Sequence, residues 1–354
     1  MIDLFGFLRF IINLILYPFA IAFLFFYRCL QWLGLQPTIY NYHDNIVLIT
    51  GSGNGLGREI ALAFAKAGAS LALLDIDDAG NRETQQQCLA ILHSQNSSSR
   101  VRVYHVDVTR AVDVYACAER VRYDLGQVTI LIANAGYVSG RTLLTESDSD
   151  IERTFGVNSL SPIWLIKAFL PYMLDANRGH VVLISSVLGK HACHGPISYV
   201  SSKHASLGLS RSLRMDIHAT HPYSRVHVHC VCPYLMRTKM FNPVINHVSL
   251  RSLLPIVSAR YVAKEVLDAI EWQRNEIILP YHLKYVGLIN DFLLPQWFSE
   301  WFLFKVSGRR PLDAFNKDND ENIREKRRKN LQTVQKENIR FDLIEFVKLL
   351  FYNQ

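Results

Sequence analysis

The sequence predicts an α/β fold with one doubly wound, seven-stranded parallel sheet. Two observations predict it. Short runs of aliphatic and β-branched residues alternate along the chain with longer amphipathic stretches. The short runs are apolar at nearly every position, as expected for strands that are covered on both faces. The seven runs are residues 46–50, 70–75, 101–106, 128–134, 180–186, 225–231 and 276–280.

The stretches between these runs have the length and polarity of helices that connect parallel strands. They are residues 56–68, 78–94, 111–125, 147–175, 198–219 and 259–273. Strands and helices in this order indicate a single Rossmann-type domain over residues 46–282. Residues 36–45 then form a linker to the N-terminal part of the chain.

The N-terminal segment carries an uncharged run, FIINLILYPFAIAFLFFY, at residues 10–27, between Arg9 and Arg28. As a helix it is roughly 27 Å long, close to the thickness of a bilayer core. No cleavage site of a signal peptide follows it, and it lacks the polar face of a core helix. We therefore expect residues 1–35 to be a membrane anchor in contact with lipid. Pro18 leaves a single span and a kinked hairpin both open.

The chain continues beyond the predicted domain with two segments of different composition. Residues 283–310 are rich in aromatic residues and leucine, which suits a packed helix, a membrane-proximal element or a substrate lid equally well. Residues 311–354 form a charged tail whose last stretch, IRFDLIEFVKLLFYN, has the spacing of an amphipathic helix. We expect a C-terminal helical extension here.

Composition excludes several classes of function. The formal net charge of the 354 residues is only +7, and no zinc-finger spacing or aromatic-plus-basic RNA motif is present, so no nucleic-acid partner is expected. The six cysteines form no CxxC pair and suit a reducing compartment better than a disulfide framework. His191, Cys193 and His194 are too close together, without a fourth ligand, to predict a metal site. Cys230 and Cys232 are expected in the core.

The stretch ITGSGNGLG connects the first predicted strand to the first helix. Gly51, Gly55 and Gly57 have the spacing of a nucleotide-binding turn, which lets the backbone approach a pyrophosphate at a helix N-terminus. Asp75 ends the second strand, 24 residues after Gly51, where its carboxylate can accept hydrogen bonds from both ribose hydroxyls. No arginine or lysine stands at 52–54 to hold a 2′-phosphate, so NAD is expected rather than NADP.

Further motifs follow in a fixed order: HVDVT with Asp107, NAG at 134–136, GVNSL with Asn158, LISS with Ser186, and YVSSK with Tyr199 and Lys203. Ser186 stands 13 residues before Tyr199. Together with TGSGNGLG at 50–57, these motifs resemble the short-chain dehydrogenase/reductase family through most of residues 46–240. The N-terminal run and Asp75 are similar to its membrane-bound branch, the retinol and 17β-hydroxysteroid dehydrogenases.

The resemblance implies a catalytic set of Asn158, Ser186, Tyr199 and Lys203. Tyr199 would exchange a proton with the substrate oxygen, Ser186 would orient that oxygen, and Asn158 would anchor a water leading to solvent. Independently of the family, a lysine ammonium one helical turn from a tyrosine is expected to lower the pKa of the phenol. The cofactor-binding residues implied are Gly51, Ser52, Asn54, Gly55, Leu56, Gly57, Asp75, Asp107, Val108, Asn134, Ala135, Gly136, Tyr199, Lys203, Pro233 and Thr238.

One position departs from the family. Many relatives have Pro-Gly after the sixth strand, whereas this chain has Pro233 followed by Tyr234. The change puts the local loop geometry in doubt and leaves the reaction class unaffected. Met236, Met240, Phe241 and residues 242–255 would then form an apolar lid over the substrate.

The resemblance therefore implies an NAD-dependent oxidoreductase of lipophilic alcohols, such as retinol or a hydroxysteroid. It also implies a place on the endoplasmic reticulum membrane or on lipid droplets, with the catalytic domain facing the cytosol. Homodimer formation through residues 111–125 and 147–175 is a further implication. The alternatives are an NADPH-dependent reductase of a lipid ketone such as 3-ketosphinganine, and a non-catalytic membrane scaffold that kept the fold.

Overall fold

A computed structural model describes residues 16–19, 21–22, 40–238, 240 and 256–284. The chain divides into two units, Met1–Tyr40 and Asn41–Gln354. In the first unit, residues 16–19 and 21–22 are helical and exposed. The rest of the predicted anchor at 1–35, most of the aromatic segment at 283–310 and the whole tail at 311–354 lie outside the described residues. No helix of the described residues has the length and apolarity needed to cross a bilayer.

The second unit contains the predicted seven-stranded sheet, and all its strands are parallel. Their order is β3-β2-β1-β4-β5-β6-β7. The bounds are β1 Ile46–Thr50, β2 Ser70–Asp75, β3 Val101–His105, β4 Ile130–Ala133, β5 Gly179–Ile184, β6 Val226–Pro233 and β7 Glu276–Leu279. The direction in which strands are added to the sheet reverses between β1 and β4. At such a reversal a crevice opens at the carboxyl ends of the strands, where sheets of this kind bind ligands.

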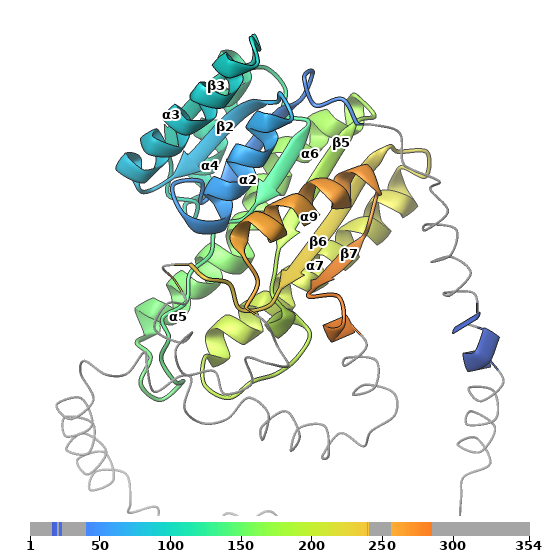
Figure 1. The fold of residues 1–354 in the computed structure, drawn as a ribbon. Coiled ribbons are helices and arrows are strands. Elements are labelled where there is room, and N and C mark those ends of the chain that lie inside the picture. The colour runs from blue at the N-terminus through green and yellow to red at the C-terminus, as the bar shows by residue number, and fades with distance from the viewer. Residues whose placement is uncertain (1–15, 20, 23–39, 239, 241–255, 285–354) are drawn as a thin grey trace, which may run out of the picture. The chain divides into compact units, whose positions relative to one another are not determined.

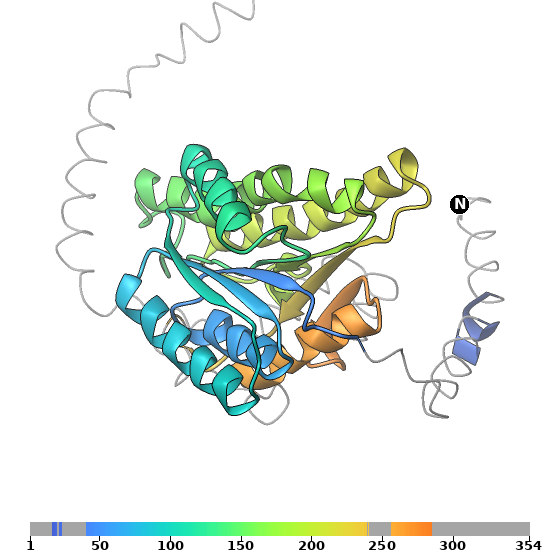
Figure 2. The same ribbon diagram turned by 90° about the horizontal axis from the view of Figure 1, so that it is seen from above.

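Helices cover both faces of the sheet (Figures 1 and 2). Helices α2, α3 and α9 pack together on one face, and α4, α6 and α7 lie on the other. Their bounds are α2 Gly55–Lys66, α3 Asp78–Ser94, α4 Ala111–Asp124, α6 Ser161–Asp175, α7 Ile197–Thr220 and α9 Ala259–Glu271. Because helices cover both faces, every residue of β4 and β5 is buried, which explains their continuous apolar runs.

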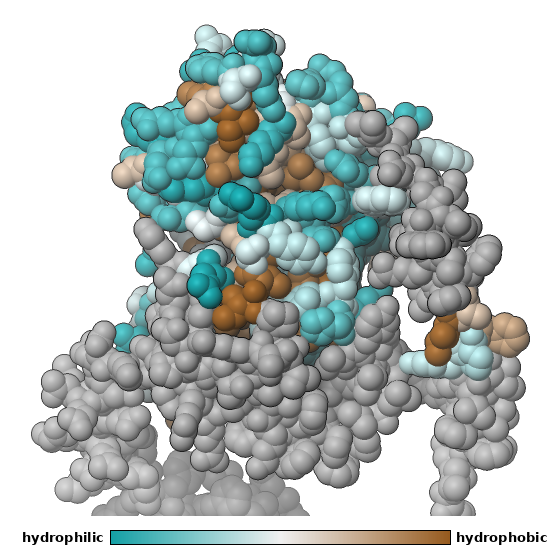
Figure 3. Space-filling view, in the orientation of Figure 1, coloured by the Kyte–Doolittle hydropathy of each residue, from teal (hydrophilic) through white to brown (hydrophobic). Residues whose placement is uncertain are grey.

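Hydrophobic side chains are confined mainly to these layers. Phe64, Leu48 and Ile132 are among the largest side chains that are completely buried. On the face seen in Figure 3, the described surface is mostly hydrophilic and carries smaller hydrophobic patches. The predicted core positions Cys230 and Cys232 are fully buried, with their sulfur atoms 3.9 Å apart.

The predicted helix over 147–175 is three elements rather than one. Helix α5, Asp148–Phe155, is followed by a π-helical turn η1, Gly156–Leu160, before α6 begins. Pro162, in the first turn of α6, has no N–H for the carbonyl of Asn158 four residues earlier. The hydroxyl of Ser206 on α7 donates to that carbonyl instead, at 2.7 Å. The interrupted segment is therefore bonded to the neighbouring helix α7 through the carbonyl of Asn158.

Three histidines lie side by side on β5 and β6. The ring of His180 stacks on the rings of His227 and His229, at centroid distances of 5.4 and 5.3 Å. His180 Nδ1 and His229 Nε2 share a hydrogen bond of 3.0 Å, and His229 Nδ1 bonds the carbonyl of Arg274 at 2.7 Å. Burial, reinforced by the neighbouring imidazoles, lowers the pKa of His180 to about 2 and that of His229 to about 4.

Candidate active site

A cavity of about 900 Å³ lies where the carboxyl ends of the strands meet the start of α7. Its walls come from the segments that follow β1 to β6 and from helices α2, α5 and α7. Most of the predicted cofactor-binding residues line it: Gly51, Asn54, Gly55, Leu56, Gly57, Asp75, Asp107, Val108, Asn134, Ala135, Gly136, Tyr199, Lys203 and Thr238.

The glycine turn is fixed by close backbone packing. Gly51 has a φ of +68°, and a Cβ atom on Gly57 would lie only 2.0 Å from the carbonyl oxygen of Gly51. The Asn134 side chain holds the turn by donating to Thr50 O at 2.8 Å and to Gly51 O at 3.3 Å. Helix α2 starts here with no side-chain cap and no acidic residue in its first turn. Its N-terminal N–H groups therefore suit a phosphate.

Thr238 reaches this turn from the far side of the crevice. Its methyl carbon lies 3.4 Å from the position that a Cβ on Gly55 would take. The glycine turn, the NAG turn at 134–136 and Thr238 thus line the same cavity. Glycines where the backbone must approach closely, a helix N-terminus and an acidic residue at the end of β2 together fit a nicotinamide dinucleotide.

Two predicted cofactor residues, Ser52 and Pro233, are not among the residues that line the cavity, and their cofactor contacts stay a prediction. The Ser52 side chain is fully buried and donates to Asn81 Oδ1 at 2.8 Å, so it holds α3 to the turn from behind. Pro233 lies at the buried end of β6, and its carbonyl accepts a 3.5 Å hydrogen bond from Ser186. Both residues support the wall of the cavity and do not form its surface.

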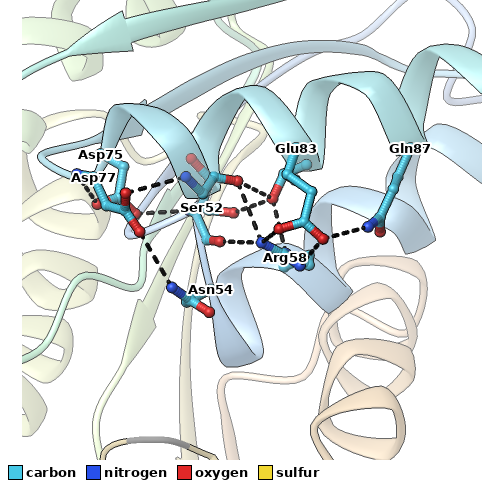
Figure 4. Close-up of polar contacts among 10 residues, drawn as sticks. Ser52, Asn54, Arg58, Asp75, Asp77, Glu83 and Gln87 are labelled. Atoms are coloured by element: carbon cyan, nitrogen blue, oxygen red, sulfur yellow. Dashed lines mark hydrogen bonds and ion pairs between the residues drawn. The ribbon is translucent and has the colours of Figure 1, made fainter.

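Asp75 lies on the cavity wall with its carboxylate already oriented by the backbone. Oδ2 accepts from Gly53 N at 2.7 Å and Oδ1 accepts from Asp77 N at 2.9 Å. The nearby guanidinium of Arg58 points toward Glu83, which it bonds twice at 2.8 Å, and also donates to Gly53 O at 2.7 Å (Figure 4). Arg58 is therefore held by α3 and by the turn itself.

Tyr199 and Lys203 lie one turn apart on α7 and are both buried, with 5% and 4% of their surfaces exposed. The Lys203 ammonium lies 5.7 Å from the centre of the Tyr199 ring and donates to the carbonyl of Ile184 at 2.9 Å. The hydroxyl of Ser185 donates to the Lys203 carbonyl at 2.8 Å. These contacts join α7 to the end of β5 directly beneath the cavity.

The buried environment shifts the pKa values of both residues. Burial raises the pKa of Tyr199, and the hydrogen bond with Ser186 opposes that rise only in part. Burial also lowers the pKa of Lys203 to about 8. Burial is the largest contribution to the pKa of Tyr199, and the expectation that Lys203 lowers the pKa of the phenol stays a prediction.

Ser186 begins the 3₁₀ turn η2, Val187–Gly189, and its hydroxyl accepts from Leu188 N at 3.1 Å. It does not line the cavity but is bonded to Tyr199, whereas Ser185 does line the cavity. The interval of 13 residues thus identified the serine that contacts the tyrosine.

Asn158 lies in the π-helical turn and is 2% exposed. Its side chain accepts from Tyr137 N at 2.8 Å and donates to Tyr137 O and Ser202 Oγ, both at 2.9 Å. A Cβ on Gly136 would lie 3.7 Å from Asn158 Oδ1 and 3.8 Å from the Lys203 ammonium. Asn158 therefore faces Lys203 across Gly136, and its role as the anchor of a water stays a prediction.

Tyr234, the departure from the family pattern, does not face the cavity. Its N–H donates to Leu279 O at 2.7 Å, and its side chain packs against a buried cluster that includes Leu207, Cys230 and Leu283. Of the predicted lid, Met236 and Met240 line the cavity, whereas Phe241 and 242–255 lie outside the described residues.

Several cavity residues were not predicted from the sequence. They include Ile76, Thr109, Tyr137, Ser149, Glu152, Arg153 and Leu160. Ile76, Thr109 and Tyr137 follow the ends of β2, β3 and β4, and their place at a carboxyl edge could have identified them. The guanidinium carbon of Arg153 lies 4.5 Å from the centre of the Tyr137 ring, and no local sequence pattern predicts this contact.

A model of the short chain dehydrogenase family matches residues 45–248, more than half of the chain. The chain belongs to the short-chain dehydrogenase/reductase family. The predicted family is thereby confirmed, and with it an oxidoreductase that acts on CH–OH groups and uses a nicotinamide cofactor.

Relatives within the family support the retinol dehydrogenase branch. The chain is 41% identical over 235 residues to short-chain dehydrogenase/reductase family 16C member 6 of Bos taurus, covering 66% of this chain and 72% of the relative. It is 37% identical to epidermal retinol dehydrogenase 2 of Mus musculus, covering 72% and 79%. It is 34% identical over 304 residues to retinol dehydrogenase 10 of Xenopus tropicalis, covering 80% and 88%.

Solved structures share the fold. A short-chain dehydrogenase/reductase from Burkholderia phymatum in complex with NAD has a TM-score of 0.63 and 24% identity, covering 71% of this chain and 94% of its own. A short-chain dehydrogenase from Sphingobium yanoikuyae in complex with NADPH has a TM-score of 0.57 and 25% identity, covering 70% and 96%. Neighbours of this fold thus carry either nicotinamide cofactor.

The packing at Gly57 gives a direct test of the cofactor turn. Gly57→Ala places a methyl group 2.0 Å from a backbone oxygen, so the turn must open, and we expect NADH affinity to fall roughly tenfold or more. Gly208→Ala in α7 is the matched control, because nothing lies within 4 Å of its Cβ position. Titration by NADH fluorescence checks both, and a folded Gly57→Ala variant with wild-type affinity contradicts the assignment.

Proposed function

We propose that this protein is an NAD-dependent dehydrogenase of a lipophilic alcohol of the retinol or hydroxysteroid type, which it converts to the aldehyde or ketone. The observation that carries the proposal is that Tyr199 and Lys203 line the cavity, with Ser186 bonded to Tyr199, in a chain related to retinol dehydrogenases. A cluster of this chemistry can move a proton at an alcohol oxygen in a dry environment.

The proposed reaction removes a proton from the alcohol oxygen and a hydride from the carbon that bears it. NAD⁺, when bound, supplies the hydride acceptor and a positively charged ring. Tyr199 exchanges the proton, and Ser186, already bonded to Tyr199, orients the oxygen. Lys203 has a pKa of about 8 and is mostly protonated at neutral pH, so its charge favours the phenolate that must accept the proton.

Burial raises the pKa of Tyr199, so the phenol holds its proton firmly. A protonated Tyr199 suits donation to a carbonyl, which is the reductive direction. Oxidation requires that the charges gathered around the phenol stabilise its anion. Both directions use the same residues, as microscopic reversibility requires, and the pH of the assay shifts the balance between them.

The preference for NAD rests on the electrostatics at the end of β2. The carboxylate of Asp75 faces the cavity and would repel a 2′-phosphate. The guanidinium of Arg58, on α2, is paired with Glu83 and bonded to Gly53 O. Arg58 is therefore poorly placed to compensate for the charge of a 2′-phosphate.

We further propose that residues 1–35 hold the enzyme on the endoplasmic reticulum membrane or on lipid droplets, with the catalytic domain in the cytosol. The support is the uncharged run at 10–27 and the partition of such substrates into lipid. Homodimer formation through α4, α5 and α6 is part of the same proposal and rests on family resemblance.

The central test is turnover of all-trans-retinol by the full-length enzyme with NAD⁺, followed as retinal formation. Tyr199→Phe removes only the phenolic oxygen, so we expect kcat/KM to fall by roughly 10²- to 10⁴-fold while NADH still binds. Retained turnover in this variant would refute proton transfer by Tyr199. A wild-type enzyme that oxidises neither retinol nor steroid alcohols would refute the substrate class.

Cofactor choice is tested at Asp75. Asp75→Ala removes the carboxylate that repels a 2′-phosphate, so we expect the ratio of kcat/KM for NAD⁺ over NADP⁺ to fall roughly tenfold or more. Asp113→Ala, on the exposed side of α4, is the charge-matched control and should keep the ratio. A wild-type preference for NADP⁺ would instead favour the lipid-ketone reductase.

Membrane attachment is tested by deleting residues 1–35. We expect the full chain to remain with the membranes after washing at alkaline pH and the shortened chain to be released, because the apolar run is lost. Immunoblots of pellet and supernatant measure the distribution. If the shortened chain stays in the washed membrane, these residues are not what attaches the protein.

A further inference from the structure

Glu146 is a carboxylate in the interior of the protein, with 3% of its surface exposed. It belongs to the loop between β4 and α5, which begins at the NAG turn beside the cavity. Burial of a carboxylate is costly unless hydrogen bonds replace its hydration. No ion pair within the described part of the chain involves Glu146. Hydroxyl groups therefore supply the hydrogen bonds that replace its hydration.

The hydroxyl donors come from two different segments. Ser139, in the same loop, bonds Glu146 Oε1 at 2.5 Å. Ser198, in the first turn of α7, contacts Oε1 at 2.8 Å and Oε2 at 2.6 Å. Ser198 is 5% exposed and directly precedes Tyr199. The carboxylate therefore joins the loop after the NAG turn to the start of the helix that carries Tyr199.

The first turn of α7 depends on this contact more than an ordinary helix start would. Its N-cap residue is Pro196, which provides no side-chain cap, and no acidic residue stands in the first turn of the helix itself. Glu146 supplies an acidic group from another segment at the helix N-terminus, where negative charge is favourable. Lys203, one turn further on, is held independently through Ile184 and Ser185.

We infer that Glu146 is a positioning residue, which sets the place of Tyr199 by holding Ser198 against the loop after the NAG turn. Neither Glu146 nor Ser198 lines the cavity. A shift of about 1 Å in a reacting group can cost roughly 100-fold in rate, so a clamp on the residue next to Tyr199 matters for chemistry. The inference rests on the proposed role of Tyr199.

The effect of removing the clamp should fall on the chemical step. In Glu146→Ala, the hydroxyls of Ser198 and Ser139 lose a buried acceptor, and the first turn of α7 is free to shift. We expect kcat for retinol oxidation to fall roughly 10- to 100-fold, with KM for NAD⁺ within about twofold. The primary deuterium isotope effect on kcat, measured with retinol deuterated at the oxidised carbon, should rise toward its full value.

Two further variants separate positioning from simple loss of stability. Glu146→Gln keeps one carbonyl oxygen as an acceptor for Ser198, so we expect it to recover most of the lost kcat. Ser198→Ala removes the other side of the contact. Its effect in the Glu146→Ala background should be much smaller than in the wild type, because the two changes break one interaction. Ser198→Ala also serves if Glu146→Ala does not fold.

Glu265→Ala is the matched control, since Glu265 is another buried carboxylate, on α9, bonded to Tyr281 and remote from α7. It should lower the melting temperature and leave kcat unchanged. The inference is overturned if folded Glu146→Ala keeps kcat within twofold of wild type. It is also overturned if NAD⁺ binding falls in parallel with kcat and Glu146→Gln gives no recovery. If Tyr199→Phe stays active, the proposed function fails first, whatever Glu146 does.

Discussion

Lys203 carries an ammonium group into the interior of the protein, and the surrounding structure is organised to accept it. The described residues place no carboxylate in ion-pair contact with this group, and its hydrogen bond goes to the carbonyl of Ile184. The end of β5, the NAG turn and η2 all approach the lysine closely. A Cβ on Gly189 would lie 2.7 Å from the Lys203 carbonyl, so this approach requires glycine. The site thus holds a desolvated positive charge, which an anion beside it would stabilise.

The π-helical turn is the second constraint, because it fixes the other side of the same space. Pro162 cannot donate to the carbonyl of Asn158, and Ser206 and Ser202 on α7 bond the carbonyl and the side chain of Asn158. Ser159 adds a bond to Ser202 O at 3.1 Å. The helix that carries the tyrosine and lysine is therefore attached along its length to the turn, to β5 and, through Ser198, to the loop after β4. π-turns of this kind are frequent at functional sites.

The sequence predicted the sheet well because strands buried on both faces leave continuous apolar runs. It predicted most of the cavity because the motifs stand at strand ends, which parallel topology brings to one edge. It could not predict that Ser52 points inward, since a turn residue has two faces and only packing with Asn81 selects one. It missed Glu146 because Ser198 lies 52 residues away. The pKa of Tyr199 depended on burial, which a one-turn spacing does not encode.

The stacked imidazoles of His180 and His229 make the stability of the fold depend on pH. In an unfolded chain a histidine takes up a proton near pH 6.5, whereas these two remain neutral until about pH 2 and pH 4. Between those values the unfolded chain binds more protons than the folded one, so acid favours unfolding. The stabilisation is complete above pH 6.5 and declines below it. With respect to these two residues, the sheet that supports the active site is thereby most stable at neutral pH and above.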